Sequence, residues 1–159
     1  MKALSAGQSL RWVEPDKRSF SLNGPNQTVL ATLAFHSACG SLATGETAEG
    51  CWTLKRVGFF KPAVSVRPVG SDTPVAVFRL ARLRLAGGSF VLWKPTNIRR
   101  TEISLETAEG RSILRLKPEF AADKHEASVA IKSTAVGAVE LSLVMLPVVA
   151  SLAPNYRLT

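Results

Sequence analysis

The chain has 159 residues, of which 46% are hydrophobic and 20% are charged, and its 20 Lys and Arg against 12 Asp and Glu give a formal net charge of +8. This length fits a single domain spanning residues 1–159 that buries a core without disulfides or metals, and the composition excludes a disordered or low-complexity protein. The excess of cations predicts a surface that attracts anions, such as nucleic acid, phospholipid headgroups or phosphorylated ligands.

The first fifteen residues, MKALSAGQSLRWVEP, contain no apolar run of signal-peptide length. We therefore expect a cytoplasmic protein. The two cysteines, Cys39 and Cys51, fit that reducing compartment. They flank an expected turn over residues 44–50 and could face each other across a hairpin, a geometry that permits a disulfide which a reducing cytoplasm would not form.

Short apolar or alternating segments then recur along the chain, separated by residues that favour turns. The twelve predicted strands cover residues 10–13, 19–22, 28–35, 39–42, 51–55, 63–67, 74–80, 81–85, 89–93, 98–105, 111–117 and 127–132. Glycines and prolines between them supply positive or fixed φ angles. Strands at this regular spacing predict a mainly β domain, either a sandwich or a barrel.

Alternation along individual strands predicts one buried face and one exposed face. In the strand at residues 51–55, Trp52 and Leu54 share one face. In the strand at residues 111–117, the same rule places Ile113 on the face opposite Leu114. Many strands with one apolar face need something apolar to enclose.

The pentapeptide Glu-Thr-Ala-Glu-Gly occurs twice, at residues 46–50 and 106–110, and each copy precedes a strand. Either the chain contains a degenerate duplication, or the same hairpin turn with a left-handed terminal glycine arose twice. The turn is the favoured interpretation, because the strands that follow the two copies are similar only in pattern.

The segment from residue 141 to residue 154 has no ionisable side chain. As a helix it would be about 21 Å long, which is short of the roughly 30 Å hydrocarbon core of a bilayer. Its apolar residues lie on nearly all sides of a helical projection, so we expect a buried helix and no transmembrane span. Pro147 predicts a kink or a break after Leu146.

The stretches CWTLKRVGFFKPAVSVRPVGSDTPVAVFR, GGSFVLWKP and AEGRSILRLKP, followed by the apolar tail, resemble the tubby C-terminal-like superfamily, in particular its small LURP-one-related and scramblase-like members. The resemblance implies a closed barrel of about twelve antiparallel strands that encloses a C-terminal hydrophobic α-helix. Tubby domains recognise phosphoinositide headgroups through surface Lys and Arg, scramblase-like relatives are associated with membranes, and many small members have no assigned activity. This chain has no headgroup motif of that family, so no lipid-contacting residue is transferred to it.

The densest cationic segment lies at residues 78–85, where alternation places Arg82 and Arg84 on one face. Two guanidinium groups at this spacing can converge on a phosphate, although outward arginines of a strand also serve solubility alone. A functional patch would have to gather cations from several strands. The candidate anion-binding or lipid-binding residues are Arg67, Arg79, Arg82, Arg84, Arg99 and Arg100.

Catalytic and metal-binding motifs are missing from the sequence. There is no nucleophile elbow, zincin helix, phosphate-binding loop or dinucleotide-binding loop, so we expect no catalytic residue and no enzymatic activity. His36 and Cys39 have the spacing of a ligand pair, but Cys51 and His125 each stand alone, so we expect no metal. We also expect no cofactor.

These observations predict a non-enzymatic binding module that docks anionic phospholipid or another phosphorylated ligand through a basic surface. Such a protein would be cytoplasmic and peripheral to a membrane. Two alternatives remain open: a basic barrel that binds nucleic acid, and a structural or protein-interaction domain.

Overall fold

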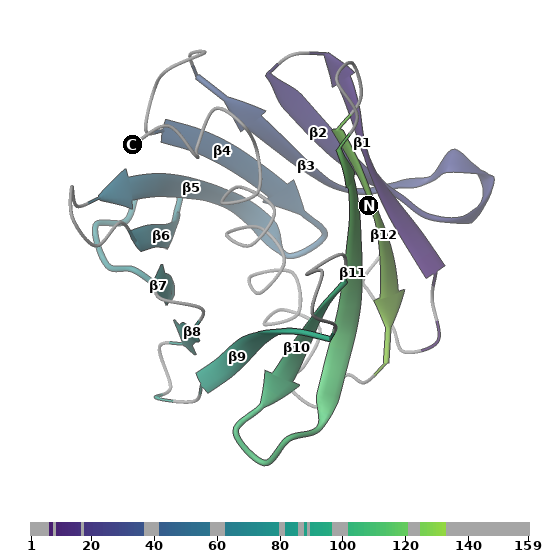
Figure 1. Ribbon diagram of the computed structural model, residues 1–159. Helices are drawn as coiled ribbons and strands as arrows, with labels where there is room; N and C mark the ends of the chain where they lie inside the picture. Colours follow the sequence, from purple (N-terminus) through teal and green to yellow (C-terminus); the bar gives the residue numbers. More distant parts are fainter. Residues whose placement is uncertain are drawn as a thin grey trace.

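Twelve β-strands close into one antiparallel barrel in the described part of the chain (Figure 1). This computed structural model describes residues 7, 9–16, 18–36, 42–57, 63–79, 82–85, 88, 90–96, 102–120 and 125–132. The strands are β1 (Ser9–Asp16), β2 (Ser19–Asn23), β3 (Val29–Phe35), β4 (Leu42–Thr47), β5 (Gly50–Val57), β6 (Ala63–Pro68), β7 (Ala76–Arg79), β8 (Arg82–Leu85), β9 (Phe90–Pro95), β10 (Ile103–Thr107), β11 (Ser112–Phe120) and β12 (His125–Ile131). The barrel predicted from the sequence is confirmed, whereas the expected helix over residues 141–154 lies outside the described residues.

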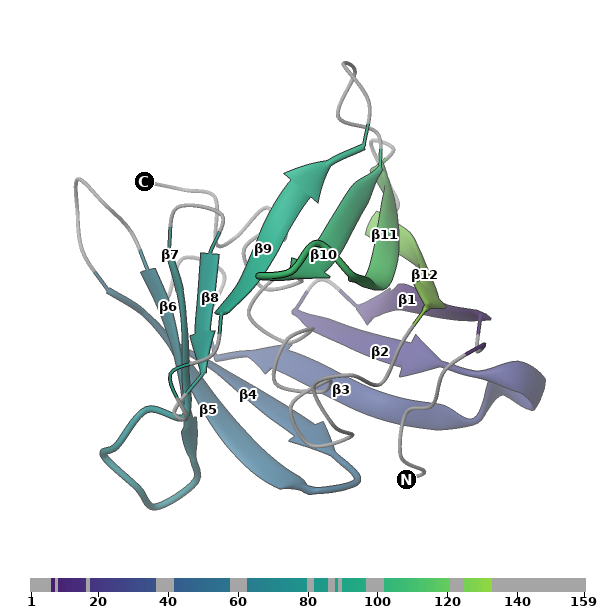
Figure 2. The ribbon, with the colours of Figure 1, turned by 90° about the horizontal axis from the view of Figure 1, so that it is seen from below.

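Each strand pairs with its neighbours in sequence, and β1 pairs with β12 to complete the ring. The closing ladder runs from Ser9 opposite Ala130 to Trp12 opposite Ala127. Figure 2 shows the strands inclined to one another around the barrel, with β6–β8 lying across the direction of β2 and β3. A closed ring leaves none of these strands with a free edge, which protects an apolar all-β chain from pairing with other chains.

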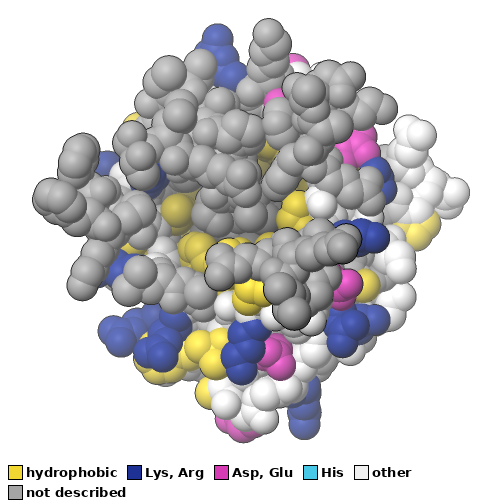
Figure 3. Space-filling model, in the orientation of Figure 1, with side chains coloured by type: hydrophobic (Ala, Val, Ile, Leu, Met, Phe, Trp, Pro, Cys, Tyr) yellow, Lys and Arg dark blue, Asp and Glu magenta, His cyan; other side chains and the backbone are white. Residues whose placement is uncertain are grey.

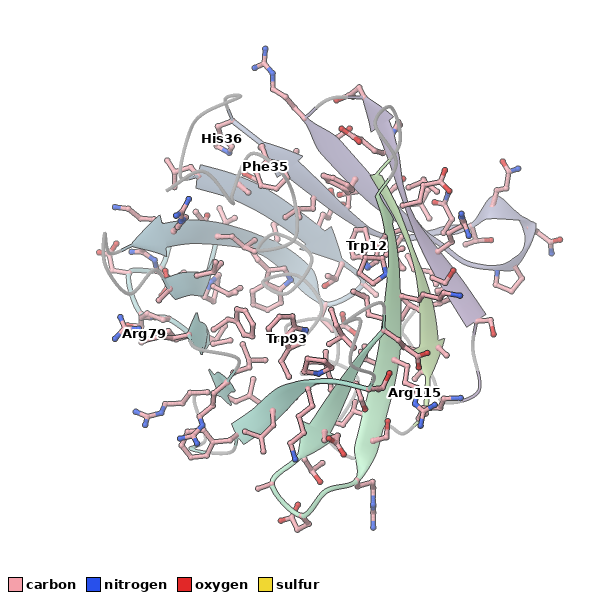
Figure 4. All side chains as sticks on the ribbon, viewed as in Figure 1. Trp12, Phe35, His36, Arg79, Trp93 and Arg115 are labelled. Atoms are coloured by element: carbon pink, nitrogen blue, oxygen red, sulfur yellow. The ribbon has the colours of Figure 1, made fainter. Side chains whose placement is uncertain are left out.

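The interior of the barrel is lined by side chains that alternate with outward-facing ones. Leu22, Leu33, Leu54 and Leu116 are fully buried. Trp52 is buried on the same face as Leu54, as the alternation predicted, while Lys55 is exposed. Trp12 and Trp93 point into the interior (Figure 4). The core is therefore the inside of the barrel.

A β-bulge between β10 and β11 changes the predicted alternation. Leu105 lies opposite Leu114, but Glu106 lies opposite Ser112, so Ile113 is the extra residue. Ile113 and Leu114 are both fully buried. The expectation that Ile113 faces away from the core was wrong, because a bulge shifts the register by one residue at that point.

The two copies of Glu-Thr-Ala-Glu-Gly form different turns. In the β4–β5 hairpin, Thr47 lies directly opposite Gly50, which has a φ of 148°. In the β10–β11 hairpin the loop is longer: the backbone N–H of Thr107 donates to Arg111, and Gly110 has a φ of 88°. One pentapeptide thus serves two hairpins of different register. In the first copy, Glu46 and Thr47 belong to strand β4 and Gly50 begins β5, so the expected turn at residues 44–50 was too long and is confined to residues 48 and 49. Of the expected strand at residues 39–42, the structure describes only Leu42, which begins β4.

Candidate anion-binding site

A hollow of about 610 Å³ lies on the outer face of β7, β8 and β9. The described residues that line it are Val77, Arg79, Arg82, Arg84 and Phe90. Lys and Arg side chains gather beside hydrophobic atoms at this side of the molecule, at the lower left of Figure 3. Arg79 points away from the barrel in Figure 4. The hollow is therefore a surface feature, separate from the barrel interior.

Strand alternation explains why these side chains share the outer face. On β8, Arg82 and Arg84 are exposed and alternate with Leu83 and Leu85, which are buried. On β7, Phe78 is buried and the following residue, Arg79, is exposed. Because successive residues of a strand point to opposite faces, burial of the apolar residues in the core turns the arginines outward.

Strand register brings the lining residues into two adjacent rows. Arg79 lies opposite Arg82 across the β7–β8 pair. In the next row, Val77 lies opposite Arg84, and Arg84 lies opposite Phe90 on β9. One row therefore holds two arginines, and the other holds an arginine between two apolar side chains.

The inner face of the same strands supports the site. Phe78 of β7 and Trp93 of β9 meet edge to face, with ring centroids 6.2 Å apart and planes at 84°. Leu83 of β8, which lies opposite Phe78, is fully buried. Edge-to-face aromatic pairs favour a defined mutual orientation. The three strands that carry the hollow are thus anchored to the core on their other side.

Phe90 contacts both arginines of β8. The guanidinium carbons of Arg82 and Arg84 each lie 5.2 Å from the centroid of its ring. A guanidinium group within about 6 Å of an aromatic centroid is attracted to the negative face of the ring. The aromatic ring therefore holds two cations that would otherwise repel each other.

The hollow carries three positive charges with no compensating carboxylate among the described residues. Arg79, Arg82 and Arg84 make no ion pair with an Asp or Glu in the part of the chain that the structure describes. The nearest cation along β9, Lys94, is paired with Glu106 at 3.7 Å. Like charges directly opposite each other destabilise a strand pair. An anion bound between Arg79 and Arg82 would reduce the repulsion between their guanidinium groups and so stabilise the pair.

The other three candidate arginines do not line the hollow in the described structure. Arg67 of β6 lies 3.9 Å from the carboxylate of Asp72 and is partly buried. Arg99 and Arg100 lie outside the described residues. The structure therefore brings together Arg79, Arg82 and Arg84, and it places Arg67 elsewhere.

Sequence reasoning missed Phe90 and Val77 as parts of the site. Both are apolar residues that face outward, and apolar residues occur at so many positions of the sequence that they do not mark a site. The only signal was the alternation of Phe90 with the buried Val91, and it gives no indication that β9 places Phe90 opposite Arg84.

A second hollow, of about 820 Å³, lies over β1, β11 and β12, and it is lined in part by Arg11, Arg115, Lys117 and Lys132. Here two of the cations are already neutralised. Arg11 forms an ion pair with Glu126, and Arg115 lies 3.6 Å from the carboxylate of Glu102. The β7–β9 hollow therefore presents the denser uncompensated charge.

Metal-ligating residues do not cluster in the described part of the chain, which contains no group of three or more His, Cys, Asp and Glu side chains suited to a metal ion. The Nε2 atom of His36 lies 2.6 Å from the hydroxyl oxygen of Thr44. Cys51 is exposed, and Cys39 lies outside the described residues. Among the described residues, no helix has the length and apolar character needed to cross a membrane.

The carboxyl group of Asp16 has a shifted pKa, and it lies at the end of β1, away from the hollow. The backbone N–H of Arg18 and the hydroxyl of Ser19 both donate to Asp16 and lower the pKa of its carboxyl group. Asp16 ends β1, and its hydrogen bonds close the turn into β2. Its role is that of a turn residue.

Comparisons with known proteins give information about the fold and none about the candidate site. No protein-family model matches the chain, and no curated protein sequence matches it. Among solved structures, the X-ray structure of a LURP-one-related protein from Arabidopsis thaliana aligns over 92% of this chain and 93% of that chain, with a TM-score of 0.59 and 9% sequence identity. At this identity the likeness shows a related fold alone.

Proposed function

We propose that this protein is a non-enzymatic binding module that docks on anionic phospholipid membranes through the outer face of β7, β8 and β9. The observation that carries the proposal is the hollow lined by Arg79, Arg82 and Arg84, whose three charges meet no carboxylate among the described residues. Cations near an anionic membrane surface contribute about 1 kcal/mol each. Three such residues would contribute about 3 kcal/mol, or a factor of roughly 150 in affinity.

The apolar part of the hollow favours a membrane over a soluble polyanion. Phe90 and Val77 line the hollow beside the arginines. Proteins that bind at a membrane interface combine cations for the headgroups with apolar side chains that enter the boundary of the acyl region. Anionic lipids give the cytoplasmic leaflet of a membrane a negative surface potential. A basic docking surface therefore fits a cytoplasmic protein that binds peripherally to that leaflet.

Vesicle co-sedimentation tests the proposal. The protein is expected to bind vesicles of phosphatidylcholine with phosphatidylglycerol and to leave pure phosphatidylcholine vesicles in the supernatant, with binding that weakens as salt rises. A triple variant, Arg79→Ala, Arg82→Ala and Arg84→Ala, should lose roughly 150-fold in affinity. The matched control removes three exposed cations elsewhere, Arg111→Ala, Lys117→Ala and Lys132→Ala, and should lose much less.

Two outcomes would overturn the proposal. Equal binding to neutral and anionic vesicles would show that the charges do not matter. Alternatively, tight binding to single-stranded DNA with a steep salt dependence and quenched Trp fluorescence, in the absence of vesicle binding, would assign the basic surface to nucleic acid.

We also propose that the chain is a small member of the tubby-like superfamily and that its apolar segment, residues 141–154, forms a helix inside the barrel. The related fold of the Arabidopsis protein supports the first part. The width of the barrel supports the second, because about eight strands already give an interior that their own side chains fill, and this barrel has twelve. Fully buried side chains such as Leu22, Leu33 and Leu116 need apolar partners across that wider interior.

A further inference from the structure

The side chain that organises the cationic hollow is its aromatic residue. The ring of Phe90 contacts the guanidinium groups of Arg82 and Arg84, each with its central carbon 5.2 Å from the ring centroid. Arg84 is its direct cross-strand partner, and Arg82 lies two residues further along the same face of β8. One ring therefore fixes the positions of two arginines.

Such contacts decide how much conformational entropy an arginine side chain loses when it binds an anion. An exposed arginine has many rotamers, and its ordering opposes the binding of an anion. A cation–π contact at an exposed site favours one arrangement by a factor of about two to five. Two contacts to one ring therefore bring both guanidinium groups into place before a ligand arrives.

The spacing suits a small anion. Residues two apart on a strand have Cα atoms about 6.8 Å apart, so the ends of the two long side chains can reach one group of oxygen atoms. A guanidinium group donates in a planar fork that matches the oxygens of a phosphate. Arg79, opposite Arg82 on β7, lies close enough in the ladder to contribute a third fork.

We propose that Phe90 is the positioning residue of this site and that the site binds the phosphate group of a single lipid headgroup through Arg82 and Arg84. The inference rests on the proposed membrane-docking function and makes it more specific. Diffuse electrostatic attraction depends only on the number of charges. A positioned site depends also on the ring and on the shape of the guanidinium groups.

The test compares variants that leave the charge unchanged, using vesicles of phosphatidylcholine with phosphatidic acid. Phe90→Leu is expected to weaken binding about 4- to 25-fold at every salt concentration, because both ring contacts are lost. The dependence of log affinity on log salt should keep its slope, since the number of cations is the same. Phe90→Trp, which keeps an aromatic face, should bind within about twofold of the wild type.

Two controls separate positioning from packing. Val77→Ala removes apolar surface from the same hollow without removing a ring, so it measures what apolar insertion contributes, and Phe90→Leu should weaken binding more than Val77→Ala does. The urea midpoint of each variant shows whether Phe90→Leu remains folded. If Phe90→Leu does not fold, Arg82→Lys provides the test, because it keeps the positive charge but loses the planar guanidinium group and should also weaken binding. Its control, Arg115→Lys on β11, should not weaken binding.

The outcomes distinguish this inference from the proposed function. A wild-type protein that ignores anionic vesicles contradicts the proposed function. A wild-type protein that binds them while Phe90→Leu binds equally well, or weakens no more than Val77→Ala, overturns the role of Phe90 and leaves membrane docking intact. Full displacement from the vesicles by inorganic phosphate, beyond the effect of chloride at equal ionic strength, would overturn the assignment to a lipid headgroup and identify the free anion as ligand.

Discussion

Trp12 and Trp52 are both buried inside the barrel, but their indole N–H groups have different surroundings. The N–H of Trp52 donates to the hydroxyl oxygen of Thr47 at 3.1 Å. The N–H of Trp12 is buried and has no hydrogen-bond acceptor among the described residues. A buried donor without an acceptor lowers stability by about 1–3 kcal/mol, whereas a satisfied one contributes about 1 kcal/mol.

This difference predicts unequal effects of the same substitution. Trp12→Phe and Trp52→Phe remove the same atoms from buried positions, but only Trp52→Phe breaks a hydrogen bond, and Trp12→Phe removes an unsatisfied group. We expect Trp52→Phe to lower the free energy of unfolding by at least about 1 kcal/mol more than Trp12→Phe. Urea denaturation of the two variants measures this, and a larger loss for Trp12→Phe would contradict it.

At the scale of elements, the two Glu-Thr-Ala-Glu-Gly hairpins place their glycines in different backbone conformations. Gly110 has a φ of 88°, near the left-handed region that Asn also tolerates. Gly50 has a φ of 148°, which is outside every region allowed to residues with a side chain. A Cβ atom at either position would meet no atom within 4 Å, so only backbone conformation opposes a substitution.

The same replacement should therefore be tolerated in one hairpin and not in the other. Gly110→Asn is expected to lower the free energy of unfolding by less than about 1 kcal/mol, and Gly50→Asn by about 1–3 kcal/mol. Thermal unfolding of the two variants gives the comparison. Equal losses would show that the two turns impose the same conformation, as a conserved duplication of one hairpin would require.

Strand alternation and turn residues carried most of the fold information in the sequence. Segments such as residues 51–55 and 63–67 lie within strands β5 and β6, because hydrophobic side chains on one face are enough to identify a strand. Alternation could not reveal the bulge at Ile113, since a bulge depends on how two strands are aligned. It also assigned residues 44–47 of β4 to a turn, because glycine and threonine at these positions favour turns.

The candidate site was predictable to the extent that it is local. Arg79 and Arg82 are close in sequence and pair across one short hairpin, so a basic run there becomes a cluster in space. Arg67 pairs with Asp72, an interaction that depends on the course of a loop. Phe90 joins the site through the register of β9 against β8, and no pattern within either strand specifies that register.

At the scale of the whole molecule, the width of a twelve-stranded barrel sets what its interior must contain. If residues 141–154 fill it, a chain that ends at Gly137 should lose cooperative unfolding and bind a hydrophobic dye such as ANS, because the interior side chains lose their partners. A chain that ends at Pro154 and lacks only the final polar residues is the matched control and should unfold cooperatively. A chain that ends at Gly137 and remains monomeric and cooperatively folded would show that the segment is peripheral.

The pairing of β1 with β12 also determines when the barrel can close during synthesis on the ribosome. Ser9 of β1 and Ala130 of β12 are direct partners in the ladder. During synthesis β1 therefore has no partner on this edge until β12, more than a hundred residues later, has been made. At a synthesis rate of about 5–20 residues per second, the unpaired edge of β1 stays exposed for roughly 6–24 s. During that interval the nascent chain presents a strand edge to any neighbouring chain. The closed ring that protects the finished protein is therefore the source of its vulnerability during synthesis.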